Sequence, residues 1–174
     1  MKKAVFLDRD GTIIVDKIYL NNVNEIEYIP GAIEGMRVMR DLGYEFVIAT
    51  NQSGIARGLV TIENLLAIHE KMRGQLAGEG IDVLGFYYAP YAVETNHPLR
   101  KPNPGMLLEG ARDFGIDLKQ SWMIGDRMSD IEAGFNAGTR TILVTTGGAR
   151  EKSDAVPTAV CKDLIEAANF IGKN

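Results

Sequence analysis

The sequence holds a single cysteine, two histidines and one tryptophan among its 174 residues. One cysteine, Cys161, excludes any disulfide bond within the chain. No apolar run reaches membrane-spanning length, and no signal-peptide core follows Met1. The formal net charge is −4 and no long run of lysine and arginine occurs, which argues against a nucleic-acid surface. These absences favour a cytoplasmic enzyme that binds neither nucleic acid nor membranes.

The rest of the composition is that of an ordinary globular protein. Hydrophobic residues make up 45% of the chain and charged residues 24%. The length fits one domain with a sizeable core. The sequence contains no internal repeat, low-complexity segment or interdomain linker. We therefore expect residues 1–174 to form a single domain.

Apolar runs that suggest strands alternate with segments that suggest helices. This alternation is typical of a parallel sheet with crossover helices. Strands are expected at residues 5–7, 45–49, 83–88, 122–124 and 140–144. Helices are expected at residues 30–43, 61–76, 104–115 and 129–137, with a closing helix from residue 163. The irregular residues 13–29 have room for a small hairpin. The sequence thus predicts a three-layer, doubly wound α/β fold with a mainly parallel sheet.

The helix expected at residues 61–76 shows how its ends and faces are inferred. Thr61 is a suitable N-cap. The residues expected to share its packed face are Ile62, Leu65, Leu66, His69, Met72 and Leu76. We expect His69 to pack there without a chemical role, and Cys161, near the closing helix, to be structural.

The stretch from Val5 to Thr12 is the most informative in the chain. Its apolar run ends at Asp8, Asp10 follows, and Gly11 permits a sharp turn. Both carboxylates then lie at the carboxyl end of a strand, where open α/β sheets bind ligands. Two acids so close repel each other unless a cation binds between them, and Mg2+ prefers such oxygen ligands. The alternative is a solvated Asp-x-Asp-Gly turn.

Polar clusters follow several of the predicted strands or lie in their loops. They are Asp8/Asp10, Thr50/Asn51, Arg100/Lys101 and Asp126/Asp130. A doubly wound topology brings the carboxyl ends of its strands to one edge of the sheet. Carboxylates for a metal, a hydroxyl beside free backbone amides and a nearby cation together indicate a site that processes phosphate.

At this point the chain resembles the haloacid dehalogenase (HAD) superfamily of aspartyl phosphotransferases. The resemblance extends from residue 8 to residue 130, with the motifs in the family's order. The motifs are Asp8-Arg9-Asp10-Gly11-Thr12, Thr50-Asn51-Gln52, Lys101-Pro102 and Gly125-Asp126-Arg127-x-x-Asp130. The resemblance implies a Mg2+-dependent phosphomonoester hydrolase that works through an aspartyl-phosphate intermediate.

The resemblance also implies a role for each acid. Asp8 would be the nucleophile that attacks phosphorus and a ligand of Mg2+. Asp10 would protonate the leaving group and then activate water, while its backbone carbonyl binds the ion. Asp126 would supply the remaining carboxylate ligand. Asp130 is either an acceptor behind the metal ligands or an early-helix acid favoured by the helix dipole.

Two further groups complete the implied catalytic set. Thr50 would donate its hydroxyl to the transferring phosphoryl group, assisted by backbone amides from Asn51 onward. Lys101 would offset charge that Mg2+ leaves uncovered. The alternatives are a simple strand-end turn for Thr50 and a solvated surface group for Lys101.

The segments between the motifs are too short for a substantial cap domain, so loops must recognise the substrate. Within the superfamily, residues 8–13, 50–58 and 100–106 are similar to the capless branch of heptose-bisphosphate and histidinol phosphatases. The similarity implies a small phosphorylated metabolite as substrate. The first candidate is D-glycero-D-manno-heptose 1,7-bisphosphate, hydrolysed at its 7-phosphate. Histidinol phosphate or another small metabolite is the alternative.

The similarity also implies which residues bind this substrate. The residues that would line the sugar phosphate are Asp16, Lys17, Ile18, Tyr19, Thr50, Asn51, Gln52 and Ser53. Arg100 would meet the second phosphate or a sugar hydroxyl, because its planar fork suits pairs of oxygens.

One feature of that branch is missing. Many members hold a structural zinc ion in the loop before the Arg-Lys-Pro motif. The corresponding positions here are Ala89, Tyr91, His97 and Leu99. One possible ligand cannot build a tetrahedral site, so we expect no structural zinc.

Two other classes of protein use parts of the same constellation. A phospho-receiver domain also has an aspartate nucleophile, a threonine, a lysine and Mg2+, but it has no general acid at the position of Asp10. A sugar-phosphate binding protein would not need Asp8 and Asp10 together. Among the remaining features, Gly147 and Gly148 are expected at the rim of the site or in a simple turn.

Overall fold

The sheet is built entirely from parallel strands. The computed structural model describes residues 1–148 and 151–174. Within these residues, six strands form one sheet in the order β3-β2-β1-β4-β5-β6. They are β1 (Ala4–Leu7), β2 (Glu45–Asn51), β3 (Val83–Ala89), β4 (Trp122–Gly125), β5 (Arg140–Val144) and β6 (Ala159–Cys161). The predicted doubly wound α/β fold is confirmed.

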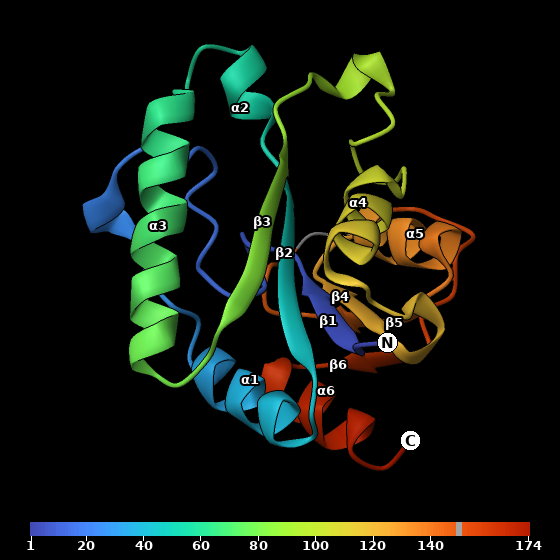
Figure 1. Ribbon diagram of the computed structural model, residues 1–174. Coiled ribbons are helices and arrows are strands. Elements are labelled where there is room, and N and C mark those ends of the chain that lie inside the picture. The colour runs from blue at the N-terminus through green and yellow to red at the C-terminus, as the bar shows by residue number, and fades with distance from the viewer. Residues whose placement is uncertain (149–150) are drawn as a thin grey trace.

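Helices cover both faces of this sheet (Figure 1). On one face lie α1 (Ala32–Asp41), α3 (Ile62–Gly78) and α6 (Leu164–Ile171). On the other lie α4 (Gly105–Phe114) and α5 (Met128–Ala137). The short helix α2 (Ser53–Ala56) follows β2 directly. Short 3-10 turns occupy Val23–Glu25, Val93–Thr95 and Leu118–Gln120. In the described chain, the connections after β1 and β3 hold no larger element that would form a cap.

The central strand β1 is buried on both faces. Val5 and Leu7 belong to the core beneath α1, α3 and α6, whereas Ala4 and Phe6 belong to the core beneath α4. All four side chains are inaccessible to solvent. Burying a large apolar side chain stabilises the fold by about 1.5–3 kcal/mol. A strand that is buried on both faces therefore reads as a continuous apolar run.

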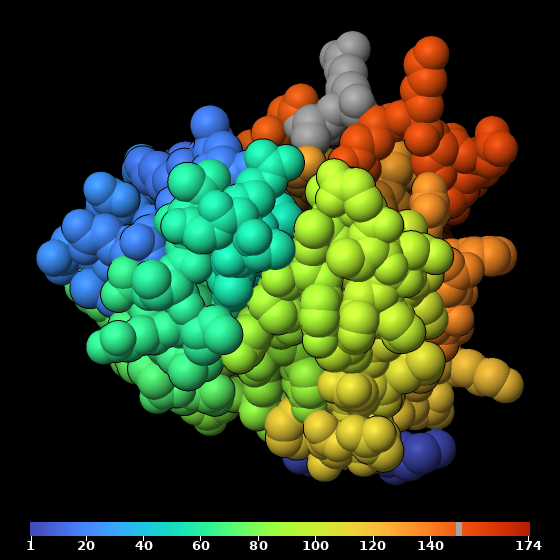
Figure 2. Space-filling model, turned by 90° about the horizontal axis from the view of Figure 1, so that it is seen from above, coloured from blue at the N-terminus to red at the C-terminus, as the bar shows by residue number. Residues whose placement is uncertain are grey.

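The strand order determines where a ligand can bind. The chain moves outward from β1 through β2 to β3 and then returns to place β4 on the other side of β1. The connections diverge at this switch point, and the carboxyl ends of the strands leave a crevice there. Figure 2 looks onto that edge and shows segments from the start, middle and end of the chain gathered on one face.

The edge strand β6 was not predicted. It has only three residues, and Val160 at its centre is 60% exposed. Such a short edge strand carries little of the apolar run that marks a buried strand. Cys161 is the last residue of β6 and its side chain is buried, which agrees with a structural role.

Two expectations near the N-terminus need correction. The helix expected from residue 30 begins at Ala32, because Gly31 adopts a left-handed conformation (φ 84°) at its N-cap. The hairpin considered for residues 13–29 is reduced to one antiparallel bridge between Ile14 and Tyr28.

Helix α3 confirms its predicted cap and most of its predicted face, since Leu65, His69, Met72 and Leu76 are buried. The Thr61 hydroxyl oxygen accepts a hydrogen bond from the Asn64 N–H at 3.1 Å. Ile62 and Leu66 are exposed, however, whereas Ile68 is buried. The apolar pattern allows two overlapping faces, and only packing against the sheet selects one of them. No helix in residues 1–148 and 151–174 has both the length and the apolar character needed to cross a membrane.

The close packing of α1 on α6 generates a prediction. A Cβ added to Gly35 would lie 2.5 Å from backbone atoms of Leu164, whereas one added to Gly74 on α3 would meet nothing within 4 Å. We expect Gly35→Ala to lower the free energy of unfolding by about 1–3 kcal/mol, because backbone cannot move aside cheaply. The control Gly74→Ala should raise it by roughly 0.5–1 kcal/mol. Urea unfolding of both variants checks this; equal effects would contradict the close packing.

Candidate active site

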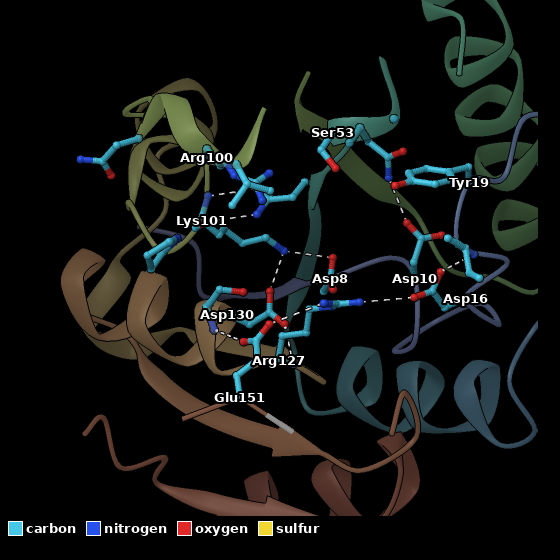
Figure 3. Close-up of a pocket in the computed structure, with 18 residues that line it drawn as sticks. Asp8, Asp10, Asp16, Tyr19, Ser53, Arg100, Lys101, Arg127, Asp130 and Glu151 are labelled. Carbon is cyan, nitrogen blue, oxygen red and sulfur yellow. Dashed lines mark hydrogen bonds and ion pairs between the residues drawn. The ribbon is translucent and has the colours of Figure 1, made fainter. Parts of the chain in front are cut away.

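A pocket of about 500 Å3 opens at the carboxyl edge of the sheet. Its lining comes from the end of β1, residues 16, 18 and 19, residues 51–54, the loop before α4 and the start of α5, together with Glu151. Figure 3 shows these segments directing polar side chains into one space. The four polar clusters recognised in the sequence therefore do converge. A volume of this size suits a small metabolite.

Asp8 lies at the floor of the pocket, immediately after β1. Its backbone N–H donates to the Ile124 carbonyl at 3.0 Å, which extends the pairing of β1 with β4 by one residue. Its carboxylate oxygen Oδ1 accepts from the Arg9 N–H at 2.8 Å and from Lys101 Nζ at 3.0 Å. Strand pairing thus fixes the backbone of Asp8, and two hydrogen bonds fix its carboxylate.

Lys101 is buried, with a side chain only 2% exposed. Its Nζ donates to Asp8 Oδ1 at 3.0 Å, to Asp130 Oδ1 at 2.6 Å and to the Ala49 carbonyl at 2.7 Å. Three acceptors satisfy the three N–H groups of an ammonium. Burial alone would lower the pKa of Lys101, but Asp130 and Asp8 more than compensate and raise it above the usual value. Lys101 therefore carries its positive charge at neutral pH.

The backbone of Lys101 is tied to the end of β2. The Asn51 side-chain amide donates to the Lys101 carbonyl at 2.9 Å, and the Lys101 N–H donates to Asn51 Oδ1 at 3.0 Å. This reciprocal pair connects segments that are distant in sequence. It explains how a loop residue can carry a precisely placed charge.

Three buried carboxylates meet next to Lys101. Asp8, Asp126 and Asp130 each offer one oxygen, and these oxygens lie within 4.8 Å of one another. Burial, followed by repulsion from Asp8 and Asp130, raises the pKa of Asp126 to about 8. Burial and Asp8 also raise the pKa of Asp130 to about 6, although Lys101 opposes this. Carboxylate oxygens that lie close together and repel one another when ionised suit a hard divalent cation.

Two glycines allow the backbone to approach Asp126. A Cβ at Gly11, which has a φ of 82°, would collide with the Asp126 carboxylate, and so would a Cβ at Gly147. The alternatives considered for Gly147 were the site's rim and a simple turn, and the structure places it directly against the acid cluster. Both positions require glycine for space.

The carboxylate of Asp10 lies apart from the three-acid group. It accepts from the Arg9 guanidinium, with Nε–Oδ1 at 3.2 Å and Nε–Oδ2 at 3.1 Å, and from Gln52 Nε2 at 2.9 Å. Burial raises the pKa of Asp10, while the Arg9 charge opposes this rise. Figure 3 shows Asp10 and Asp130 on different sides of the pocket.

Each carboxylate oxygen of Asp130 has its own hydrogen-bond partner. Its Oδ2 accepts from the Arg127 N–H at 3.0 Å at the start of α5, and its Oδ1 accepts from Lys101. The first bond belongs to a capping arrangement, and the second connects Asp130 to the acids of the site. Its place in the three-acid group was not expected.

Most residues expected at the substrate do line the pocket. They are Asp16, Ile18, Tyr19, Asn51, Gln52, Ser53 and Arg100. Lys17 is the exception, because its ammonium pairs with Glu27 at 2.6 Å away from the lining. Thr50 is completely buried behind the lining, where its hydroxyl accepts from Gln52 Nε2 at 2.8 Å.

Ile18 is the unusual member of the lining. Its φ of 69° lies in the left-handed region, which a β-branched residue rarely adopts. The Asp16 carboxylate accepts the Ile18 N–H at 2.7 Å and so stabilises the turn. The side chain of Ile18 remains 80% exposed at the pocket mouth.

The sequence analysis did not assign a role to Arg127, which the structure places at the pocket mouth. Its guanidinium lies 3.5 Å from Asp16 Oδ2 and 3.5 Å from Glu151 Oε1. Although burial lowers the pKa of Arg127, the acids around it, first of all Asp126, raise it overall. Its position directly after Asp126 in the fourth motif was the available signal. Glu151 lies in no motif and could not have been found this way.

Side-chain packing holds the loop at the positions where many members of the similar branch bind zinc. The rings of Tyr91 and His97 stack with centroids 3.6 Å apart and an interplanar angle of 15°. His97 Nδ1 accepts the Leu99 N–H at 3.1 Å. These residues do not fit a tetrahedral zinc site, which needs four ligands.

Comparisons with known proteins agree with the resemblance to the HAD superfamily. Residues 98–167 match the HAD-hydrolase-like family. The D-glycero-beta-D-manno-heptose-1,7-bisphosphate 7-phosphatase of Pasteurella multocida is 42% identical over 154 residues, covering 84% of each chain. The protein of that name from Escherichia coli K12 is 44% identical over 154 residues, covering 83% of this chain and 80% of its own. The crystal structure of D,D-heptose 1,7-bisphosphate phosphatase from B. bronchiseptica, complexed with magnesium and phosphate, matches over 98% of both chains with a TM-score of 0.86 and 32% identity.

The acid cluster predicts how stability varies with pH. The folded pKa of Asp126 is about 8, above its ordinary 3.8, so its bound proton stabilises the fold at low pH. That contribution is lost as the pH rises toward 8. Without divalent cations, we expect the free energy of unfolding to fall by on the order of 1–3 kcal/mol between pH 5 and pH 8. Added Mg2+ should reverse the loss at pH 8.

The matched variant is Asp126→Asn, which carries no titrating proton. Its unfolding free energy should change less between pH 5 and pH 8 and should respond weakly to Mg2+. Thermal unfolding in EDTA and in Mg2+ measures both effects. A variant with the same pH profile as the wild type would show that Asp126 does not carry this charge repulsion.

Proposed function

This chain belongs to the HAD-like hydrolases, and we propose that it removes the 7-phosphate from D-glycero-D-manno-heptose 1,7-bisphosphate with the help of Mg2+. The convergence of a three-acid cluster, a buried ammonium and two rim guanidiniums in one pocket carries this proposal. The names of the 42% and 44% identical relatives support the choice of substrate. Membership of this family also removes the phospho-receiver alternative.

We assign the divalent cation to the acid cluster. Asp8, Asp126 and the backbone carbonyl of Asp10 would hold Mg2+, with Asp130 beside them. When bound, the ion neutralises part of the charge on the phosphoryl group and the acids around it. The rise in the pKa of Asp126 supports this assignment, since a cation relieves the repulsion that causes it.

Asp8 is the proposed nucleophile. Lys101 and the Arg9 N–H both bind its Oδ1, so we assign the attack on phosphorus to Oδ2. The P–O bond to the sugar breaks as the bond to Asp8 forms, giving an aspartyl-phosphate. Lys101 stabilises the negative charge beside this bond. Thr50 and the backbone amides after β2 would support the other phosphoryl oxygens. To do so the Thr50 O–H would exchange its long bond to the Asn51 carbonyl, at 3.5 Å, for one to the phosphoryl group, while Gln52 goes on donating to the Thr50 oxygen.

Asp10 is the proposed acid and base. In the first step it donates a proton to the leaving sugar oxygen, and in the second it takes a proton from the water that attacks the aspartyl-phosphate. The water then releases inorganic phosphate and restores the Asp8 carboxylate. The raised pKa of Asp10 supports this role, because a carboxyl group must hold a proton before it can donate one.

The second phosphate has cationic partners at the pocket mouth. Arg100 and Arg127 line the mouth, whereas Lys101 lies buried at the floor. Cations at two depths suit a molecule with two phosphates better than one with a single phosphate and a cationic amine, such as histidinol phosphate. We therefore place the distal phosphate against the two guanidiniums.

The cytoplasmic location and the absence of nucleic-acid or membrane partners stay predictions.

The nucleophile is tested with Asp8→Asn. Turnover of heptose bisphosphate should fall by at least about 10³-fold, because an amide cannot attack phosphorus. Acid quenching of the wild type with labelled substrate should trap phosphate on the protein, and the variant should trap none. Asp41→Asn, which removes an exposed carboxylate, is the matched control and should keep wild-type turnover. Near-normal turnover in Asp8→Asn would refute covalent catalysis.

The substrate assignment is tested with Arg127→Ala. Losing one charge-assisted contact should lower kcat/KM for the bisphosphate by roughly 10- to 100-fold. The same variant should act on heptose 7-phosphate within about threefold of the wild type, since that substrate lacks the distal phosphate. Arg112→Ala, at an exposed arginine on α4, is the control. Equal losses on both substrates would exclude a role for Arg127 in binding the distal phosphate.

A further inference from the structure

An arginine and a histidine form a buried pair behind the pocket, and none of the catalytic steps above uses it. Arg9 is 1% exposed and His69 is 3% exposed. Neither residue lines the pocket, and they come from the turn after β1 and from the middle of α3. Arg9 Nη1 lies 3.1 Å from His69 Nε2. A fully buried guanidinium is unusual and needs a partner for each of its donors.

The remaining donors of Arg9 bind Asp10. Nε lies 3.2 Å and 3.1 Å from the two carboxylate oxygens, and Nη2 lies 3.1 Å from Oδ1. This two-pronged contact restricts rotation of the carboxylate plane in a way that a single contact cannot. Arg9 therefore determines how Asp10 presents its oxygens to the pocket.

His69 holds the far end of the guanidinium. Arginine can only donate, so His69 Nε2 must be the acceptor and the ring must be neutral. Burial and the charges of Arg9 and Arg73 lower the pKa of His69 to about 3, which agrees with a neutral ring. The ring is itself fixed by stacking on Phe86, with centroids 4.8 Å apart. The chain of contacts thus runs from β3 through His69 and Arg9 to Asp10.

Gln52 holds Asp10 from the other side. Its Nε2 donates to Asp10 Oδ2 at 2.9 Å and to Thr50 Oγ1 at 2.8 Å. The carboxylate is therefore held between Arg9 and Gln52 before any substrate enters. The described chain has no cap domain whose closure could reorient it.

We propose that Arg9 and His69 are positioning residues that hold Asp10 in line with the leaving-group oxygen. This inference rests on the proposed acid role of Asp10. Proton transfer requires the acid within hydrogen-bond reach of the leaving oxygen, so a freely rotating carboxylate would transfer its proton less often. The side chains of the pair contact Asp10 and do not line the pocket, whereas Arg9 reaches Asp8 through its backbone N–H, which a side-chain substitution leaves in place.

The test compares His69→Leu with His69→Gln on two esters. Glutamine keeps an acceptor for Arg9 Nη1, whereas leucine has none. The sugar phosphate is the heptose bisphosphate, whose leaving oxygen must be protonated. The other ester is p-nitrophenyl phosphate, whose leaving group is a phenolate that is stable without a proton. The measured quantity is kcat/KM, which reports the steps up to release of the first product. Asp10→Asn gives the pattern expected when the acid is removed altogether.

We expect His69→Leu to lower kcat/KM for the sugar phosphate by about tenfold and for the aryl phosphate by less than about threefold. His69→Gln should recover most of the loss. Equal losses on both esters, or a glutamine variant as impaired as the leucine variant, would overturn the proposal. If His69→Leu does not fold, Arg9→Lys serves, because it keeps the charge but cannot contact both Asp10 and His69.

The Arg9→Lys variant should show the same selective loss on the sugar phosphate, and an equal loss on both esters would overturn the proposal. Failure of the proposed function looks different. A wild-type protein that hydrolyses neither ester would refute the phosphatase itself. Normal wild-type hydrolysis combined with unselective variants would refute only the positioning role.

Discussion

Mutual repulsion among Asp8, Asp126 and Asp130 is the constraint on which the rest of the site depends. Their oxygens are buried within a few ångströms of one another, and a single ammonium, Lys101, contacts two of them. Asp126 is left with a pKa of about 8, so full ionisation needs another cation. The fold therefore holds three carboxylates close enough to repel one another when all of them are ionised. This repulsion lowers the free energy of unfolding, and apolar burial in the two hydrophobic cores offsets it.

The parallel sheet makes this arrangement possible. The carboxyl ends of β1, β2 and β4 are neighbours. The residues directly after β1 and β4 are Asp8 and Asp126, and β2 itself supplies the Ala49 carbonyl. The backbone at Gly11 and Gly147 then closes around Asp126. Loop residues such as Lys101 are held as firmly as strand residues because Asn51 binds the loop backbone. Rigid placement of this kind suits a site that no cap domain covers within residues 1–148 and 151–174.

The predicted strands match best where apolar runs are buried on both faces, as at Val5–Leu7, because burial leaves a direct mark on composition. The family and the fold could be identified because their motifs and alternation are local. Predictions failed where a choice depended on neighbours. Strand β6 is short and half exposed, and the packed face of α3 includes Ile68 rather than Leu66. Neither outcome can be derived from local pattern, because each depends on what the segment packs against.

Local sequence is enough to identify which acids, hydroxyl and cations are present and which predicted strand ends they follow. How these groups are arranged around one another depends on tertiary packing. It separated the Asp10 carboxylate from the three acids, brought Asp130 among them, and turned Lys17 toward Glu27. It also joined Arg9 to His69 across 60 positions of the chain. Side-chain hydrogen bonds form only at about 3 Å. Whether two side chains come that close depends on how the whole chain folds, and spacing in the sequence does not determine it.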